Sequence, residues 1–187
     1  RRLEAWLQRL LATKDAEQLE AEIHRALLSE DEEVVATVVD GARAAASATS
    51  LAAVPIIAEL SRRYLVAADI PRWFYRGSLE FLERLTEPEI ASIRRMLQET
   101  ESITSERVSI IGPRNERPWR AVGDFNPTAE ADDSIKLTEF DDARRLFVWM
   151  KRCDLSLESN SWGDADDPNV VVMKREVHGW LRAAFLG

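Results

Sequence analysis

Two consecutive helix-start signals in residues 69–100 constrain the fold more than any other stretch of the chain. Asp69 can accept a hydrogen bond from a free amide of a first helical turn, and Pro71 then sits where a missing N–H costs nothing. Residues 86–89, with the sequence TEPE, combine a capping box with a first-turn proline. The stretch therefore predicts two helices joined by a short link.

The apolar residues of both predicted helices recur at intervals of three and four, which is the spacing of one helix face. Gly77, inside the first helix, costs about 1 kcal/mol relative to alanine. The residues expected to be buried are Phe74, Ser78, Phe81, Leu82 and Leu85 in the first helix, and Ile90, Ile93, Met96 and Leu97 in the second.

Four further helices are predicted before residue 69. The first carries Leu3, Trp6, Leu7, Leu10 and Leu11 at helical spacing, and the second begins at Asp15. An acidic run at residues 29–33 starts the third, and its small residues 41–48 predict a face on which another helix packs closely. The fourth covers residues 51–65. Six short helices with short polar links indicate an antiparallel bundle, and no fixed-period repeat favours a solenoid.

The pattern changes after residue 102. Residues 107–111 are typical of a strand, 112–115 of a turn, and 119–122 of a return strand. A polar loop follows at 124–134, then a helix that starts near residue 138, strands at 155–157 and 170–173, and a final helix over 175–185. We therefore predict a mostly α protein: a helical bundle in residues 1–102 followed by a small α+β module in residues 103–187.

Composition excludes several functional classes. Of the 187 residues, 45% are hydrophobic and 31% charged, which is typical of a globular protein. The net charge of −8 disfavours a protein that coats nucleic acid or an anionic membrane. Cys153 is the single cysteine, so no intrachain disulfide can form. The chain starts at Arg1 without a signal-peptide pattern or an apolar run long enough for a membrane, and we expect part of a cytoplasmic protein.

Catalytic and cofactor signatures are not recognisable in the sequence, so we expect no cofactor and no bound metal. The acidic loop 161–169, with Asp164, Asp166 and Asp167, has the composition of a cation site but not the spacing of a calcium loop. Glu20 and His24, one helical turn apart, are interpreted as a surface pair because no third ligand is apparent. A solvated hairpin loop is the favoured interpretation of the acidic residues.

Arginines and aromatic residues in the middle of the chain suggest two interaction sites. In the first turns of the helix after Pro71 they could anchor a protein partner, because amphipathic aromatic residues favour interfaces. In the segment around Trp119 they could contact a phosphate or stack on a base. Core packing or a salt-bridged surface is the simpler interpretation of each. The candidate interface residues are Arg72, Trp73, Tyr75, Arg76, Arg114, Arg117, Trp119 and Arg120.

Residues 78–86, with the sequence SLEFLERLT, are followed by Pro88 and Glu89. This segment resembles the leucine-rich corner between two helices in bacterial helical proteins of the abortive-infection alpha-like family. It covers about a sixth of the chain. The resemblance implies a bacterial cytoplasmic protein linked to phage defence, without assigned catalytic residues.

The sequence thus favours a non-enzymatic interaction or regulatory module of a bacterial cytoplasmic protein, which binds a protein partner or forms a homo-oligomer. One alternative is a nucleic-acid-binding regulator that uses the C-terminal module. A less favoured alternative is a metal-dependent hydrolase built on the acidic loop.

Overall fold

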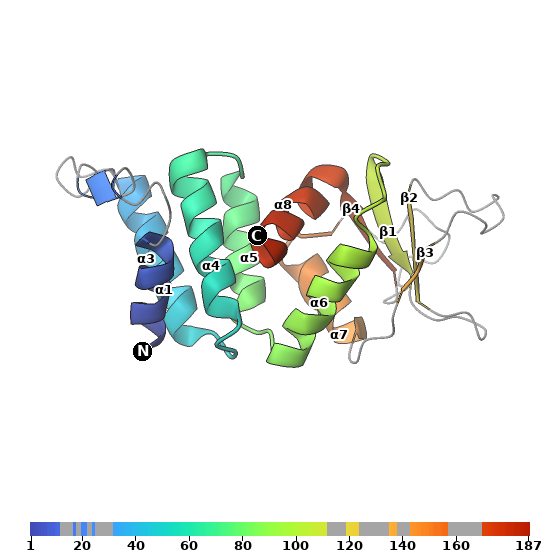
Figure 1. Ribbon diagram of the computed structural model, residues 1–187, viewed down its shortest axis with the longest axis horizontal. Helices are drawn as coiled ribbons and strands as arrows, with labels where there is room; N and C mark the ends of the chain where they lie inside the picture. The colour runs from blue at the N-terminus through green and yellow to red at the C-terminus, as the bar shows by residue number, and fades with distance from the viewer. Residues whose placement is uncertain are drawn as a thin grey trace. The chain divides into compact units, whose positions relative to one another are not determined.

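The computed structural model describes residues 1–11, 17, 20, 21, 24, 32–111, 119–123, 135–137, 143–156 and 170–187. This part of the chain is mostly helical, with a small four-stranded antiparallel sheet in its C-terminal part (Figure 1), which confirms the predicted fold class. The chain divides into two compact units. The first comprises residues 1–87 and Gly187, and the second residues 88–186.

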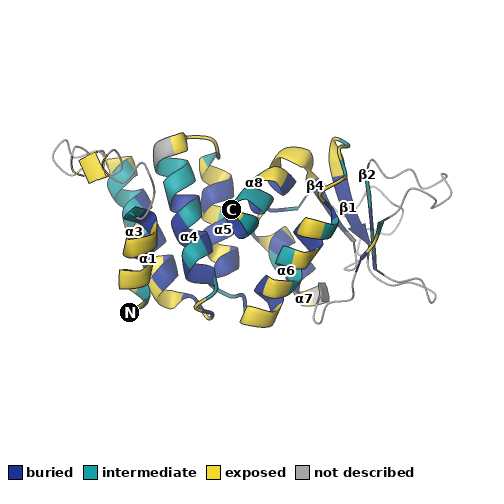
Figure 2. Ribbon diagram, in the orientation of Figure 1, coloured by how far each residue is buried: buried dark blue, intermediate teal, exposed yellow. Residues whose placement is uncertain are grey.

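The first unit consists of helices. Its elements are α1 (Arg2–Leu11), α3 (Glu32–Ser47), α4 (Ala53–Arg62), a π-helical turn η1 (Arg63–Ala67) and α5 (Arg72–Leu82). The four α-helices were predicted within a few residues, whereas the π-helical turn was not predicted. Of the predicted helix from Asp15, only residues 17, 20, 21 and 24 are described, and they are helical. The helices of this unit have buried and exposed sides (Figure 2). The predicted faces of α5 and of the small-residue run are buried, whereas Leu3 and Leu7 of α1 are exposed.

The helices α3, α4 and α5 meet at Gly41 in the middle of α3. A β-carbon at Gly41 would lie 2.6 Å from Oγ of Ser61 on α4 and 2.9 Å from the hydroxyl of Tyr75 on α5. Cζ2 of Trp6, on α1, would be 3.1 Å away. The absence of a side chain at this one position therefore lets the helices approach closely, as the run of small residues predicted.

Hydrogen bonds of Ser61 and Tyr75 join these helices at the same place. The Tyr75 hydroxyl donates to the carbonyl oxygen of Thr37 (3.0 Å) and lies 3.1 Å from Oγ of Ser61. Ser61 is near the end of α4, whereas Thr37 and Tyr75 are in the early turns of α3 and α5. The ion pairs Arg72–Glu33 and Arg76–Asp40 advance in the same direction along both helices, so α3 and α5 run parallel to each other. Short links join α4 to both, and it runs antiparallel to them (Figure 1).

The link between α4 and α5 differs from the sequence-based expectation. The π-helical turn is followed by its C-cap residue Ala68, whose φ of 48° is left-handed. Asp69 does not cap α5, because its carboxylate pairs with the guanidinium of Arg63 instead. Pro71 is the N-cap residue of α5 and provides no side-chain cap. The prediction of an aspartate cap was therefore wrong, since an arginine from the preceding turn competes for that carboxylate.

The second unit contains α6 (Glu87–Glu99), α7 (Ala143–Arg152), α8 (Arg175–Leu186) and the sheet. The strands are β1 (Arg107–Ile111), β2 (Arg120–Gly123), β3 (Ile135–Lys136) and β4 (Val170–Lys174), in the order β3-β2-β1-β4 with every pair antiparallel. The strand β3 was not predicted. Leu155 and Ser156, which were predicted to start a strand, are not in one.

The helix α6 groups with the sheet rather than with the helices before it. Its Arg94 donates through Nε to the carbonyl oxygen of Phe185 on α8 (2.9 Å), and Thr100, just after α6, contacts His178 on α8 (2.7 Å). These contacts place the division between compact units after Glu87, whereas the sequence pattern placed a domain boundary after residue 102. The boundary after residue 102 stays a prediction, since it concerns which part of the chain folds on its own.

The buried His178 is held in its neutral form. The Thr100 hydroxyl donates to the carbonyl oxygen of Met96 (2.8 Å), so it can only accept from Nε2–H of His178. Burial, together with the positive charge of Arg182, lowers the pKa of His178 from 6.5 to about 4. No local pattern in the sequence indicated this interaction.

We expect Gly41→Ala to destabilise the protein by about 1–3 kcal/mol, because the new β-carbon meets Ser61 and Tyr75 in a packed core. Gly179→Ala is the matched control, since nothing lies within 4 Å of a β-carbon there. Its loss of a helical glycine should stabilise the protein by up to about 1 kcal/mol. Urea unfolding monitored by circular dichroism measures both values. Equal effects of the two substitutions would contradict the close approach at Gly41.

We expect the free energy of unfolding to fall as the pH falls from 6.5 towards 4. The unfolded chain binds a proton at His178 in this range and the folded chain does not, so acid favours unfolding. The loss can reach about 3 kcal/mol, since each unit of pKa difference corresponds to about 1.4 kcal/mol. Denaturant unfolding at several pH values should show a weaker pH dependence for His178→Gln. The same dependence in both proteins would contradict this assignment.

Candidate interaction surface

Charged and aromatic side chains line α3 and α5 on the outside of the first unit. The parallel course of the two helices places them in register, so that Arg72 lies 3.9 Å from Glu33 and Arg76 lies 3.6 Å from Asp40. We call this region the α3/α5 surface. Its residues are Glu33, Asp40, Arg43, Arg72, Trp73, Arg76, Leu79, Glu80 and Glu83.

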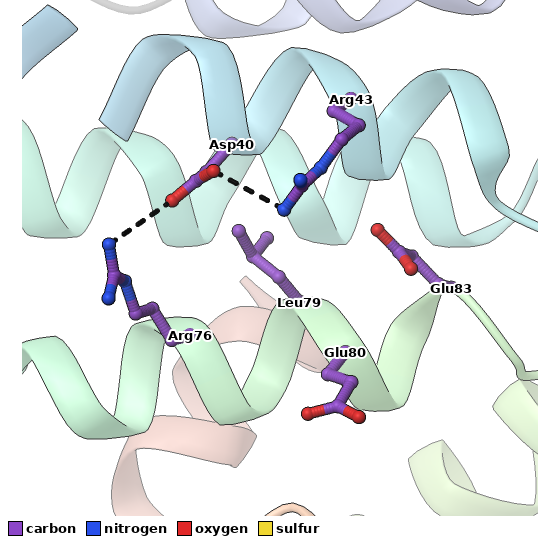
Figure 3. Close-up of a pocket in the computed structure, with 6 residues that line it drawn as sticks. All are labelled: Asp40, Arg43, Arg76, Leu79, Glu80 and Glu83. Carbon is purple, nitrogen blue, oxygen red and sulfur yellow. Dashed lines mark hydrogen bonds and ion pairs between the residues drawn. The ribbon is translucent and has the colours of Figure 1, made fainter. Parts of the chain in front are cut away.

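A groove of about 390 Å³ lies within the α3/α5 surface, between the two helices (Figure 3). Leu79 points into it from α5 and is 5% exposed. The carboxylate of Asp40 forms ion pairs with both guanidinium groups that line the groove, that of Arg43 at 3.3 Å and that of Arg76 at 3.6 Å. The groove therefore has an apolar residue between charged walls, and its positive charge exceeds its negative charge at the Asp40 end.

The other end of the groove is acidic. Glu83 lines it and makes no ion pair with another described residue. The side chain of Glu80 lies on the same helix and pairs with Arg84, one turn further on, at 3.1 Å. All these groups are at least partly exposed, so each pair contributes at most about 1 kcal/mol to stability. These ion pairs set the order of charges along the surface and contribute little to the stability of the fold.

A second cavity of about 290 Å³ lies beside Tyr64, between η1 and the start of α3. The Tyr64 hydroxyl donates to Oε1 of Glu33 (2.7 Å), and its ring stacks on that of Tyr75 with centroids 4.9 Å apart. Burial and the hydrogen bond to Glu33 raise the pKa of Tyr64, so it remains a phenol at neutral pH. This contact fixes Glu33 at one edge of the α3/α5 surface.

Trp73 is the aromatic residue of the α3/α5 surface that solvent reaches. It is 48% exposed, and its ring forms a T-shaped pair with that of Phe74, with centroids 5.9 Å apart. Arg72 and Arg76 flank it, each with 54% of its side chain exposed. These three predicted interface residues therefore lie together on one accessible face of α5.

Tyr75 is not part of that face, although it was predicted as an interface residue. It is 1% exposed, because the spacing of α5 turns it inward, where its hydroxyl reaches Thr37 and Ser61. Burial also raises its pKa. The aromatic ring and polar hydroxyl that suggested an interface instead serve the contact between α3, α4 and α5.

Trp119 is also buried, at 7% exposure, and packs edge-to-face on Phe147 with centroids 5.4 Å apart. Its ring cannot serve as a platform for a base in this conformation. Arg120 is half-buried at the start of β2. Arg114 and Arg117 lie outside the described residues. The structure thus brings together Arg72, Trp73 and Arg76, and it does not bring together a site around Trp119.

One ion pair in the second unit was missed by sequence reasoning. Glu89, 3% exposed in the first turn of α6, accepts a hydrogen bond from Nε of Arg145 on α7 at 2.9 Å. The guanidinium of Arg145 also lies 4.7 Å from the ring centroid of Trp149. The spacing of Arg145 and Trp149 by one helical turn was the only available signal. This cluster fastens α6 to α7 and offers no free group for chemistry.

The metal and catalytic candidates gain no support. Residues 161–169 lie outside the described part of the chain, where the interpretation of the acidic loop stays a prediction. In the described part, no three His, Cys, Asp or Glu side chains are grouped for a metal ion. Glu20 and His24 are both exposed, and the thiol of Cys153 is buried. None of the helices searched there is long and apolar enough to cross a membrane.

Comparisons with known proteins assign no family to this chain. No family model matches it, and no curated protein and no solved structure shows a significant match. The resemblance to the abortive-infection alpha-like family stays an expectation from the sequence.

Proposed function

We propose that the chain is a non-enzymatic interaction or regulatory module of a bacterial cytoplasmic protein, and that it binds a protein through the α3/α5 surface. The observation that carries this proposal is the position of Trp73. It is half exposed, flanked by two arginines, and lies on a helix whose inner face is tightly packed. Tryptophan and arginine are the residues most enriched among those that dominate binding energies at protein interfaces.

The packing beneath the surface supports a preformed binding face. Phe74, Phe81 and Leu82 of α5 are fully buried, and Tyr75 is hydrogen-bonded to α3. A face on rigid helices loses little conformational entropy on binding, which favours affinity. The groove adds a concave region between charged walls, into which a partner's side chain can insert.

The alternatives have less support. A nucleic-acid-binding role relied on Trp119 as a stacking residue, and that ring packs inside the second unit. A metal-dependent hydrolase relied on acidic residues outside the described part. A link to phage defence, which the sequence resemblance implies, is retained as part of the proposal, and the genes that neighbour this one would test it.

We expect Trp73→Ala to weaken capture of the partner at least about 30-fold, since a central tryptophan contributes about 2 kcal/mol or more to a protein interface. The immobilised chain would be exposed to lysate of the native host, and retained proteins would be quantified by mass spectrometry. Val148→Ala is the matched control, because Val148 is 52% exposed on α7 in the second unit.

Circular dichroism would check that both variants keep the fold. Loss of a bound protein with Trp73→Ala but not with Val148→Ala is the expected result. Equal retention of every bound protein by the two variants would contradict the role of this surface.

A further inference from the structure

A stripe of exposed and partly exposed residues follows the outer face of α5. Trp73, Arg76 and Glu80 follow one another at intervals of three and four positions, so they lie on one side of α5, with Gly77 next to Arg76 on that side. Arg84 continues the same spacing just beyond the end of α5. Arg76 and Glu80 expose 54% and 49% of their side chains. The stripe thus has an aromatic residue at one end, opposite charges in the middle and no side chain at Gly77.

The charges in this stripe do not neutralise each other. Arg76 is one helical turn from Glu80, yet it turns towards Asp40 on α3, while Glu80 turns towards Arg84. The helix therefore presents a positive group and then, one turn later, a negative group. Such a sequence of charges is complementary to itself when it is reversed.

We propose that a second copy of this chain docks on the α3/α5 surface, with the two α5 helices antiparallel about a two-fold axis level with Ser78. This inference rests on the proposed function, whose partner it identifies. In that arrangement Arg76 of each copy faces Glu80 of the other. Trp73 of each copy faces Glu83 of the other, the carboxylate that has no ion pair with a described residue of its own chain.

Charge complementarity selects the antiparallel arrangement. In the docked pair, negative and positive charges alternate along one row. The row runs from Asp40 to Arg76 of one copy and continues to Glu80 and Arg84 of the other. The two-fold symmetry produces this row twice. A parallel arrangement would instead place Arg76 opposite Arg76. Like charges in contact across an interface repel each other strongly, so the parallel pair is disfavoured.

Gly77 lies beside the two-fold axis and lets the helix backbones approach. The distance between packed helices depends on the side chains at their crossing point, and a glycine there permits the shortest distance. Close approach brings Trp73 into contact with the second copy and removes its exposed ring from water. The same glycine costs helix stability, which makes its presence in the middle of α5 consistent with a role at a contact.

Sedimentation equilibrium with charge reversals tests this arrangement. The wild-type chain should form dimers that weaken as the salt concentration rises. Arg76→Glu and Glu80→Arg should each weaken the dimer at least about tenfold, because each brings like charges together twice. Arg95→Glu, at an exposed position on α6, is the control and should leave the dimer unchanged.

Combining the two reversals provides the sharpest test. A mixture of the Arg76→Glu chain and the Glu80→Arg chain should form a heterodimer, since both cross-contacts then join opposite charges. The double variant Arg76→Glu/Glu80→Arg should dimerise again for the same reason. A wild-type chain that is monomeric at millimolar concentration would overturn the proposal. So would single reversals that dimerise normally, or a mixture of folded single variants that remains monomeric.

These outcomes separate the second-copy proposal from the proposed function. A monomeric wild-type chain whose capture of a different protein depends on Trp73 would remove the second copy as partner and leave the interaction module intact. A monomeric chain with no Trp73-dependent partner would remove both.

Discussion

The close approach of three helices at Gly41 is the contact on which the first unit depends. Ser61 and Tyr75 occupy the space that a side chain at Gly41 would need, and both are themselves buried. Because protein interiors are packed as densely as organic crystals, such a contact admits little rearrangement. It holds α3 and α5 side by side and parallel, with α4 antiparallel to both.

The parallel course of α3 and α5 generates the candidate site. It brings Glu33 and Asp40 of one helix to Arg72 and Arg76 of the other, and it leaves Trp73 exposed beside them. A shift of one residue along either helix would separate these pairs and rotate Tyr75 away from Thr37. The order of charges on the surface is thus a consequence of a buried contact, although the charged pairs themselves contribute little stability.

Most helices and strands could be predicted from the sequence because their signals are local. Apolar spacing identified the buried faces of α5 and α6, and short runs rich in β-branched residues identified β1 and β4. The cap of α5 was predicted wrongly because Arg63, six residues earlier, competes for Asp69. Local patterns carry no information about such a competitor.

The candidate site could be predicted only in part, for the same physical reason. Arg72, Trp73 and Arg76 are exposed together as expected, but Tyr75 and Trp119 look equally suited to an interface in the sequence and are buried. Whether an amphipathic aromatic ring faces water or a neighbouring helix depends on tertiary contacts. The contacts of Glu89 with Arg145 and of His178 with Thr100 join residues far apart in the chain and had no local signal.

A double-mutant cycle between Gly41→Ala and Ser61→Ala measures the central contact most directly. Removing Oγ of Ser61 takes away the atom nearest to a new β-carbon at Gly41. The cost of Gly41→Ala should therefore be smaller in the Ser61→Ala background, with a coupling free energy of at least about 0.5 kcal/mol in denaturant unfolding. Strict additivity of the two substitutions would contradict the view that this approach organises the helices.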